Sequence, residues 1–127
     1  MIHSPLIEKY LTQLQGVSFS KQYPVLDLAC GSGRNGLYLI ANDIPVTFAD
    51  INSEALGRVK HSLSNLTAEQ QKLAQCWQVD FEQASIAQKD TAPLHGKAFS
   101  VVLVFRYLHR PLFEQIKATI KPGGMVI

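Results

Sequence analysis

The chain alternates between short apolar runs and longer segments whose apolar residues recur on one helical face. The short runs predict strands, and they span residues 24–29, 46–49, 74–79 and 101–105. Residues 125–127 predict the start of a further strand. Strands and helices that alternate at this spacing predict right-handed βαβ units. The pattern therefore predicts a doubly wound α/β fold with a mostly parallel sheet flanked by helices.

Capping signals place the helices between these strands. Ser4-Pro5 predicts the start of an amphipathic helix over 5–15, which would cover a core that spans 24–127. Asn52 or Ser53 is a suitable cap for the helix after the second strand, and Thr67-Ala68-Glu69-Gln70 has the spacing of a capping box. A further helix is expected over 111–120, before Pro122-Gly123-Gly124. With 127 residues, the chain predicts a single domain over 1–127.

Composition excludes several classes of protein. A net charge of +2 without clustered Lys and Arg argues against a nucleic-acid-binding domain. The longest apolar run, Val101–Phe105, is too short to cross a bilayer, and residues 1–5 lack the pattern of a signal peptide. Cys30 and Cys76 are too few for a disulfide framework and are expected to be reduced. We therefore expect a cytoplasmic domain with no membrane partner.

A glycine-rich turn carries the first sign of a ligand. Residues 31–36, Gly-Ser-Gly-Arg-Asn-Gly, match the pattern G-x-G-x-x-G between a predicted strand and a predicted helix. Glycines let the backbone approach a ligand closely. Asp50 follows the next strand, 19 residues after Gly31, where an acid can accept both hydroxyls of a ribose. The spacing therefore predicts a nucleotide-type ligand.

The acidic residues separate two ligand classes. Asp27 lies near the end of the first strand and Asp80 follows the third, so both join Asp50 at the carboxyl edge of the predicted sheet. Such an edge suits S-adenosylmethionine, whose ammonium and sulfonium groups are cationic, better than the anionic pyrophosphate of a dinucleotide. An NAD(P)-binding oxidoreductase domain stays open as the alternative, as does a non-catalytic binding module of the same fold.

The sequence also resembles a known family. Val25–Ile40 is similar to the first motif of the class I S-adenosylmethionine-dependent methyltransferases, especially the small tellurite-resistance-type members. Phe48–Asn52 and Gln78–Phe81 are similar to the segments after the second and third strands of that fold, and Ile120–Ile127 is similar to its K-P-G-G turn. The resemblance implies a Rossmann-like fold, S-adenosylmethionine as the cofactor and methyl transfer as the activity.

Carried over by position, the resemblance assigns part of the site to the methionine half of the cofactor. Gly31 and Gly33 would let the backbone pass close to this half, and Asp27 would lie near its amino group. The resemblance thus implies that the methionine half lies against the turn between the first strand and the following helix.

On the adenosine side, Asp50 would hold the ribose hydroxyls and Ile51 would pack on the adenine ring. Asp80 would accept a hydrogen bond from the adenine amino group, with Phe81 beside the ring. The resemblance thus implies a cofactor site at the ends of the first three strands.

The segment after the fourth strand is expected to face the methyl acceptor. It lacks the Asn/Asp-Pro-Pro-Tyr/Phe motif of methyltransferases that act on planar amino groups, which argues against methylation of adenine N6 or of glutamine. A small-molecule acceptor is expected. Arg106 is a candidate for holding an anionic acceptor, and His109 is a candidate general base. His3, His61 and His95 show no metal-ligand spacing, so no metal site is expected. The acceptor itself is not identified by the sequence.

The chain stops at Ile127, where the resembled fold ordinarily continues with a helix and further strands. We therefore expect a truncated domain in which the sheet edge beyond the fourth strand is incompletely covered. Because an uncovered apolar edge can pair with another chain, either self-association through this edge or modest stability is expected.

Overall fold

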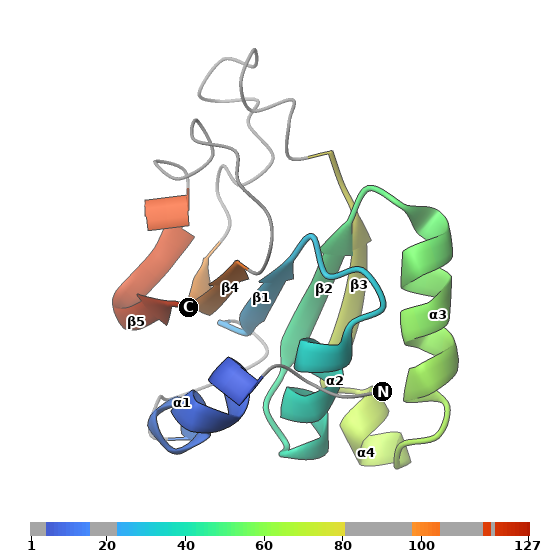
Figure 1. Cartoon of the computed structure of the whole chain (residues 1–127), viewed down its shortest axis with the longest axis horizontal. Helices are drawn as coiled ribbons and strands as arrows, with labels where there is room; N and C mark the ends of the chain where they lie inside the picture. The colour runs from blue at the N-terminus through green and yellow to red at the C-terminus, as the bar shows by residue number, and fades with distance from the viewer. Residues whose placement is uncertain (1–4, 16–22, 81–97, 105–115, 118) are drawn as a thin grey trace.

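The computed structural model of the protein describes residues 5–15, 23–80, 98–104, 116–117 and 119–127. Helices and strands alternate along the chain, as Figure 1 shows. The helices are α1 (Pro5–Gln15), α2 (Arg34–Ala41), α3 (Ser53–Leu63) and α4 (Ala68–Gln71). The strands are β1 (Val25–Leu28), β2 (Val46–Asp50), β3 (Ala74–Gln78), β4 (Phe99–Val104) and β5 (Ile120–Val126).

The strands form one parallel sheet in the order β3-β2-β1-β4-β5. β1 lies in the middle, and each of its residues is buried, as expected for a strand covered on both faces. The chain runs outward from β1 to β2 and β3 and then crosses to β4 on the other side. In such sheets, ligands bind at the carboxyl ends of the strands where the order reverses. The predicted doubly wound α/β fold is confirmed.

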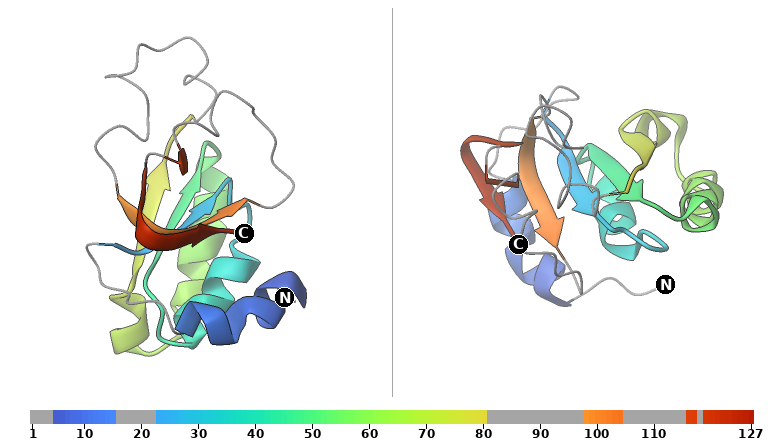
Figure 2. Two further views of the ribbon diagram at one scale, coloured as in Figure 1. Left: turned by 90° about the vertical axis from the view of Figure 1, so that its left-hand side faces the viewer. Right: turned by 90° about the horizontal axis from the view of Figure 1, so that it is seen from above.

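One face of the sheet packs against α1, α2 and α3 (Figure 2). Ile7 and Leu14 of α1, Leu39 of α2 and Val59 of α3 share a buried cluster with Phe48 of β2. A second cluster is built on the other face; its buried members are Leu26, Leu28, Ala49, Phe99, Val102 and Ile116. Burial of apolar surface on both faces holds the strand ends in fixed positions.

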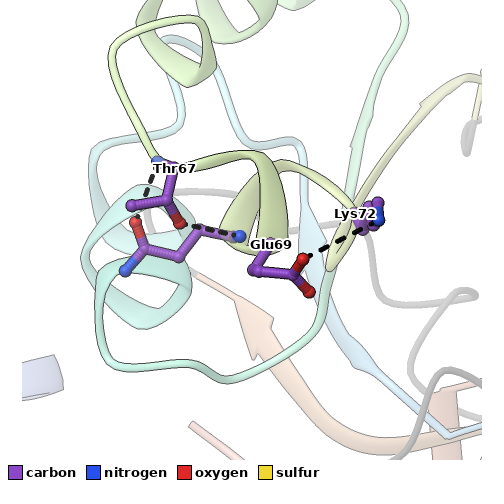
Figure 3. A network of polar contacts seen from close by, with 4 residues as sticks. Thr67, Glu69 and Lys72 are labelled. Atoms are coloured by element: carbon purple, nitrogen blue, oxygen red, sulfur yellow. Dashed lines mark hydrogen bonds and ion pairs between the residues drawn. The ribbon is translucent and has the colours of Figure 1, made fainter.

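The predicted caps are found at the helix starts. Asn52 caps α3, and its side-chain oxygen accepts from the backbone N–H groups of Glu54 and Ala55 at 2.9 and 3.4 Å. Thr67 and Gln70 form the capping box of α4, at 3.1 and 3.3 Å (Figure 3). Both caps satisfy backbone donors that a helix start leaves without partners.

The last strand differs from its prediction. β5 begins at Ile120 rather than near Met125, so the predicted start of this strand is wrong. Of the helix expected over 111–120, residues 116, 117 and 119 are helical, and residues 111–115 and 118 lie outside the described residues. Opposite β4, Ile120 pairs with Phe99 and Met125 pairs with Val101, so the register shifts between these pairs. The Pro-Gly-Gly segment lies between these pairs, where the register shifts. Proline lacks an N–H group to donate to a neighbouring strand, so it is tolerated at such an irregularity. β5 therefore covers more of the edge of β4 than expected.

Helix length also bears on membrane insertion. None of the helices in the described parts of the chain is long and apolar enough to cross a membrane. The longest of them, α1 and α3, have 11 residues each, whereas a spanning helix needs about 20.

Candidate cofactor site

The turn from β1 to α2 brings the backbone to the carboxyl edge of the sheet (Figure 1). Gly31 and Gly33 have φ values of +56° and +78°, which glycine adopts without the strain that a side chain brings. Gly33 precedes α2 and has no room for a side chain, because an added Cβ would lie 2.7 Å from Cγ2 of Val59. The turn is therefore held tightly against α3 at Gly33.

The same turn is open at Gly31. Apart from its chain neighbours, a Cβ added to Gly31 would meet no atom of the described residues within 4 Å. The Gly31 N–H nevertheless has a partner, because it donates to Oδ2 of Asp50 at 2.8 Å. This bond joins the β1–α2 turn to the end of β2, and the described residues leave the space at the glycine open.

Asp50 links two turns with its carboxylate. Oδ2 accepts from Gly31, and Oδ1 accepts from the Asn52 N–H at 2.9 Å. A carboxylate offers about four acceptor positions, so further positions exist for a ligand's hydroxyl groups. Asp50 is partly buried at the edge of the site, which fits the predicted contact with a ribose.

Ile51 follows Asp50 and is unusual in its exposure. Its side chain is 60% exposed, although most large apolar residues in the described parts of the chain are buried. Its carbonyl accepts from Nε2 of Gln78 at 3.1 Å. An apolar side chain fixed in the open beside Asp50 is suited to pack on a flat ring, as predicted for the adenine.

Asp27 lies beneath the turn rather than in the open. It is 4% exposed, and its Oδ2 accepts from the Gly36 N–H in the first turn of α2 at 3.2 Å. Three causes together raise the pKa of Asp27 from 3.8 to about 7: burial, which is the largest and raises it, the Gly36 hydrogen bond, which lowers it, and the nearby charge of Asp50, which raises it. Asp27 thus lies within the core beneath the turn and holds the start of α2 through Gly36.

Gly36 belongs to the predicted glycine motif but is not among the predicted cofactor-binding residues. An added Cβ there would collide with Cε1 of the Phe48 ring and lie 2.8 Å from Oδ2 of Asp27. Gly36 therefore lets α2 sit directly on the sheet over the buried carboxylate. The third glycine of G-x-G-x-x-G is a sequence signal for this close packing.

Asp80 is described at the end of the third strand. It lies partly buried just after β3, at the same edge as Asp50. Phe81, Arg106 and His109, the other predicted site residues, lie outside the described residues. Their proposed contacts with the adenine and the acceptor stay predictions.

The two cysteines form no disulfide bond. Cys30 and Cys76 are free and partly buried, and burial raises the pKa of both thiols. Cys30 also lies near the charges of Asp27 and Asp50, which raise its pKa further. Both are therefore poor nucleophiles. Within the described residues, no group of His, Cys, Asp and Glu has the arrangement of a metal site.

Solved structures share this fold. The glycopeptide N-methyltransferase MtfA, complexed with S-adenosyl-L-methionine, has a TM-score of 0.71 at 21% identity, over 94% of this chain and 51% of that one. The CcbJ methyltransferase from Streptomyces caelestis has a TM-score of 0.70 at 19% identity, over 94% of this chain and 47% of that one. For TehB from Haemophilus influenzae, the TM-score is 0.64 at 23% identity, over 92% of this chain and 38% of that one. The chain thus spans about half the length of the first two structures.

Sequence comparison gives the family. No curated protein sequence matches the chain. A family model described as a methyltransferase domain matches residues 25–124, the segment that holds the glycine turn and the acidic edge. S-adenosylmethionine, the predicted cofactor, is the methyl donor of this family. The resemblance predicted from the sequence is confirmed, and the chain belongs to the methyltransferase domain family.

Proposed function

We propose that this chain binds S-adenosylmethionine and takes part in methyl transfer to a small-molecule acceptor. The observation that carries the proposal is the space at Gly31, which the described residues leave open, together with the Asp50 carboxylate bonded to Gly31 and the exposed Ile51 that follows Asp50. These features fit the backbone approach, the ribose contact and the adenine contact that the cofactor needs. Methyltransferases of similar fold support the proposal, including MtfA, which acts on a glycopeptide.

Charge favours this cofactor over a dinucleotide. Asp27, Asp50 and Asp80 lie at or beneath the carboxyl ends of β1, β2 and β3. A cationic ligand is attracted to such an edge, whereas a pyrophosphate would be repelled by it. An NAD(P)-binding oxidoreductase is therefore the weaker alternative.

Different residues would contact different parts of the cofactor. The backbone at Gly31 and Gly33 would border the methionine half, and Asp50 would orient the ribose. Bound S-adenosylmethionine supplies a methyl group that its positively charged sulfur activates. The chain's part is to hold reactants in line and to keep water away, which can lower the barrier by several kcal/mol.

The acceptor side of the proposal rests on sequence. We propose that Arg106 holds an anionic group of the acceptor and that His109 is available as a general base. We also propose a cytoplasmic location, supported by the free thiols of Cys30 and Cys76. Self-association through the sheet edge stays a prediction, with β5 now the strand at that edge.

Calorimetry with S-adenosylhomocysteine and with NADH, run in parallel, tests the cofactor. We expect the protein to bind S-adenosylhomocysteine and not NADH, and Asp50→Asn to weaken that binding by at least about tenfold through the lost charged hydrogen bonds. Glu54→Gln is the matched control, since it removes an exposed acid nearby and should leave affinity unchanged. Tight binding of NADH alone would overturn the proposal.

Turnover separates an enzyme from a binding module. Incubation with methyl-labelled S-adenosylmethionine and pools of small molecules should yield labelled product. Binding without any transfer, across acceptors of diverse chemistry, would favour the non-catalytic module.

A further inference from the structure

We propose that Gln78 is a positioning residue that fixes Ile51 to receive the nucleoside half of the cofactor. This inference rests on the proposed function, because it assigns a part of the same site. Gln78 belongs to β3, the strand at the edge of the sheet, and none of the predicted cofactor contacts involves it.

The sheet register brings Gln78 to the site. In the parallel pairing of β2 and β3, Gln78 lies opposite Asp50, and the Val79 N–H donates to the Asp50 carbonyl at 3.0 Å. The Gln78 side chain reaches one residue further and donates from Nε2 to the Ile51 carbonyl at 3.1 Å. β3 therefore holds the chain at both Asp50 and Ile51, just past the end of β2.

One peptide unit is held from both sides. The unit between Ile51 and Asn52 contains the Ile51 carbonyl and the Asn52 N–H. The carbonyl accepts from Gln78, and the N–H donates to Oδ1 of Asp50 at 2.9 Å. With both ends bound, the plane of this peptide cannot rotate freely, and the direction of the Ile51 side chain is set with it.

This restraint matters because Ile51 gains little orientation from packing. Its side chain is 60% exposed, so the core does not hold it. A contact surface that is ordered before binding avoids the entropy cost of ordering it on binding. The Gln78 amide is thus the group that prepares Ile51 for a flat apolar partner, while Asp50 binds directly.

A double-mutant cycle tests the inference. Gln78→Met keeps the length of the side chain and removes the donor, so the affinity for S-adenosylhomocysteine should fall by about three- to tenfold, the worth of one hydrogen bond. In an Ile51→Ala background, the same change should cost less than about twofold, because the group it positions is gone. Gln75→Met, on an exposed position of the same strand, should leave affinity unchanged.

Amide hydrogen exchange gives a readout in the free protein. Gln78→Met should raise the exchange rate of the Asn52 amide several-fold, whereas Gln75→Met should not. An unchanged Asn52 rate, or an equal loss of affinity with and without the Ile51 side chain, would overturn the inference. Either result would refute the role of Gln78 alone, because the wild-type protein would still bind S-adenosylhomocysteine. A wild-type protein that does not bind S-adenosylhomocysteine would refute the proposed function itself.

Discussion

Two turns at the same edge of the sheet differ in how they are built. The β1–α2 turn runs through Gly31 and Gly33, and the carboxylate beneath it, Asp27, is buried. The β2–α3 turn follows Asp50, exposes Ile51 and starts its helix with a side-chain cap. Both turns connect a parallel strand to a helix, yet one presents mainly backbone and the other mainly side chains.

The difference shows what each turn contributes. Around the first turn, packing decides the structure, because Gly33 and Gly36 leave no space for a methyl group. In the second, hydrogen bonds to Asp50 decide it. The Gly31–Asp50 bond connects the two turns. We call the close-packed residues Asp27, Gly33 and Gly36 the base of the site, and the more open residues Gly31, Asp50 and Ile51 its rim. Substitutions at the base should therefore change stability, and those at the rim should change binding.

The largest expected effect comes from the buried acid. Unfolded Asp27 ionises near pH 3.8 and the folded one near pH 7, so the unfolded state holds fewer protons between these values. The free energy of unfolding therefore falls as pH rises across this window. Asp27→Asn should make the protein more stable at pH 8, by up to about 4 kcal/mol, and by much less at pH 4. Denaturant unfolding at both pH values measures this.

The same substitution should weaken cofactor binding. Asparagine keeps an acceptor for the Gly36 N–H but removes the charge that attracts a cationic ligand. Greater stability together with lower affinity for S-adenosylmethionine would show that the acid is kept for function. A pH-independent gain in stability would mean that folding does not raise the pKa of Asp27.

The second prediction concerns the packing of α2. Gly36→Ala would push a methyl group into the Phe48 ring and the Asp27 carboxylate, and neither belongs to a flexible surface side chain. Overpacking of this kind costs about 1–3 kcal/mol, which thermal or denaturant unfolding would detect. An unchanged midpoint would show that α2 can shift away from the sheet, and the contrast between base and rim would then fail.

Much of this arrangement follows from local sequence signals. The apolar runs predict four of the strands to within about two residues, because buried parallel strands leave a continuous apolar pattern. Asn52 and Thr67 mark helix starts by the hydrogen bonds that only such side chains supply. The location of Asp27, Asp50 and Asp80 at the carboxyl edge of the sheet follows from their positions near the ends of predicted strands.

Other features depend on contacts between distant residues, which no local pattern records. The start of β5 at Ile120 is set by pairing with β4, whereas the Pro-Gly-Gly segment alone predicts a stop. The hydrogen bond from Gln78 to Ile51 spans 27 positions and needs the register of two strands. Likewise, the burial of Asp27 under Gly36 appears only when α2 is placed on the sheet.

The third prediction probes the rim at its glycine. In Gly31→Ala the added methyl group meets no atom of the described residues beyond its chain neighbours, so the expected cost to stability is that of the positive φ, about 1–2 kcal/mol. Binding should suffer more, because the methyl group would fill the space proposed for the cofactor. We expect at least about a tenfold loss of S-adenosylhomocysteine affinity by calorimetry. Unchanged affinity would place the ligand elsewhere on the edge.

The smallest effect is expected at Gly57, which serves as the reference for the changes at Gly31 and Gly36. Gly57 lies exposed in the interior of α3, and an added Cβ would again meet none of the described residues within 4 Å. Because its φ is not positive, Gly57→Ala removes only the backbone freedom of glycine and should stabilise the protein by about 0.5–1 kcal/mol. Cofactor affinity should not change. The same glycine-to-alanine change is thus expected to destabilise the protein at Gly36, to weaken cofactor binding at Gly31 and to stabilise the protein at Gly57. A loss of stability in Gly57→Ala would show that open space around a glycine does not predict whether the protein tolerates alanine there.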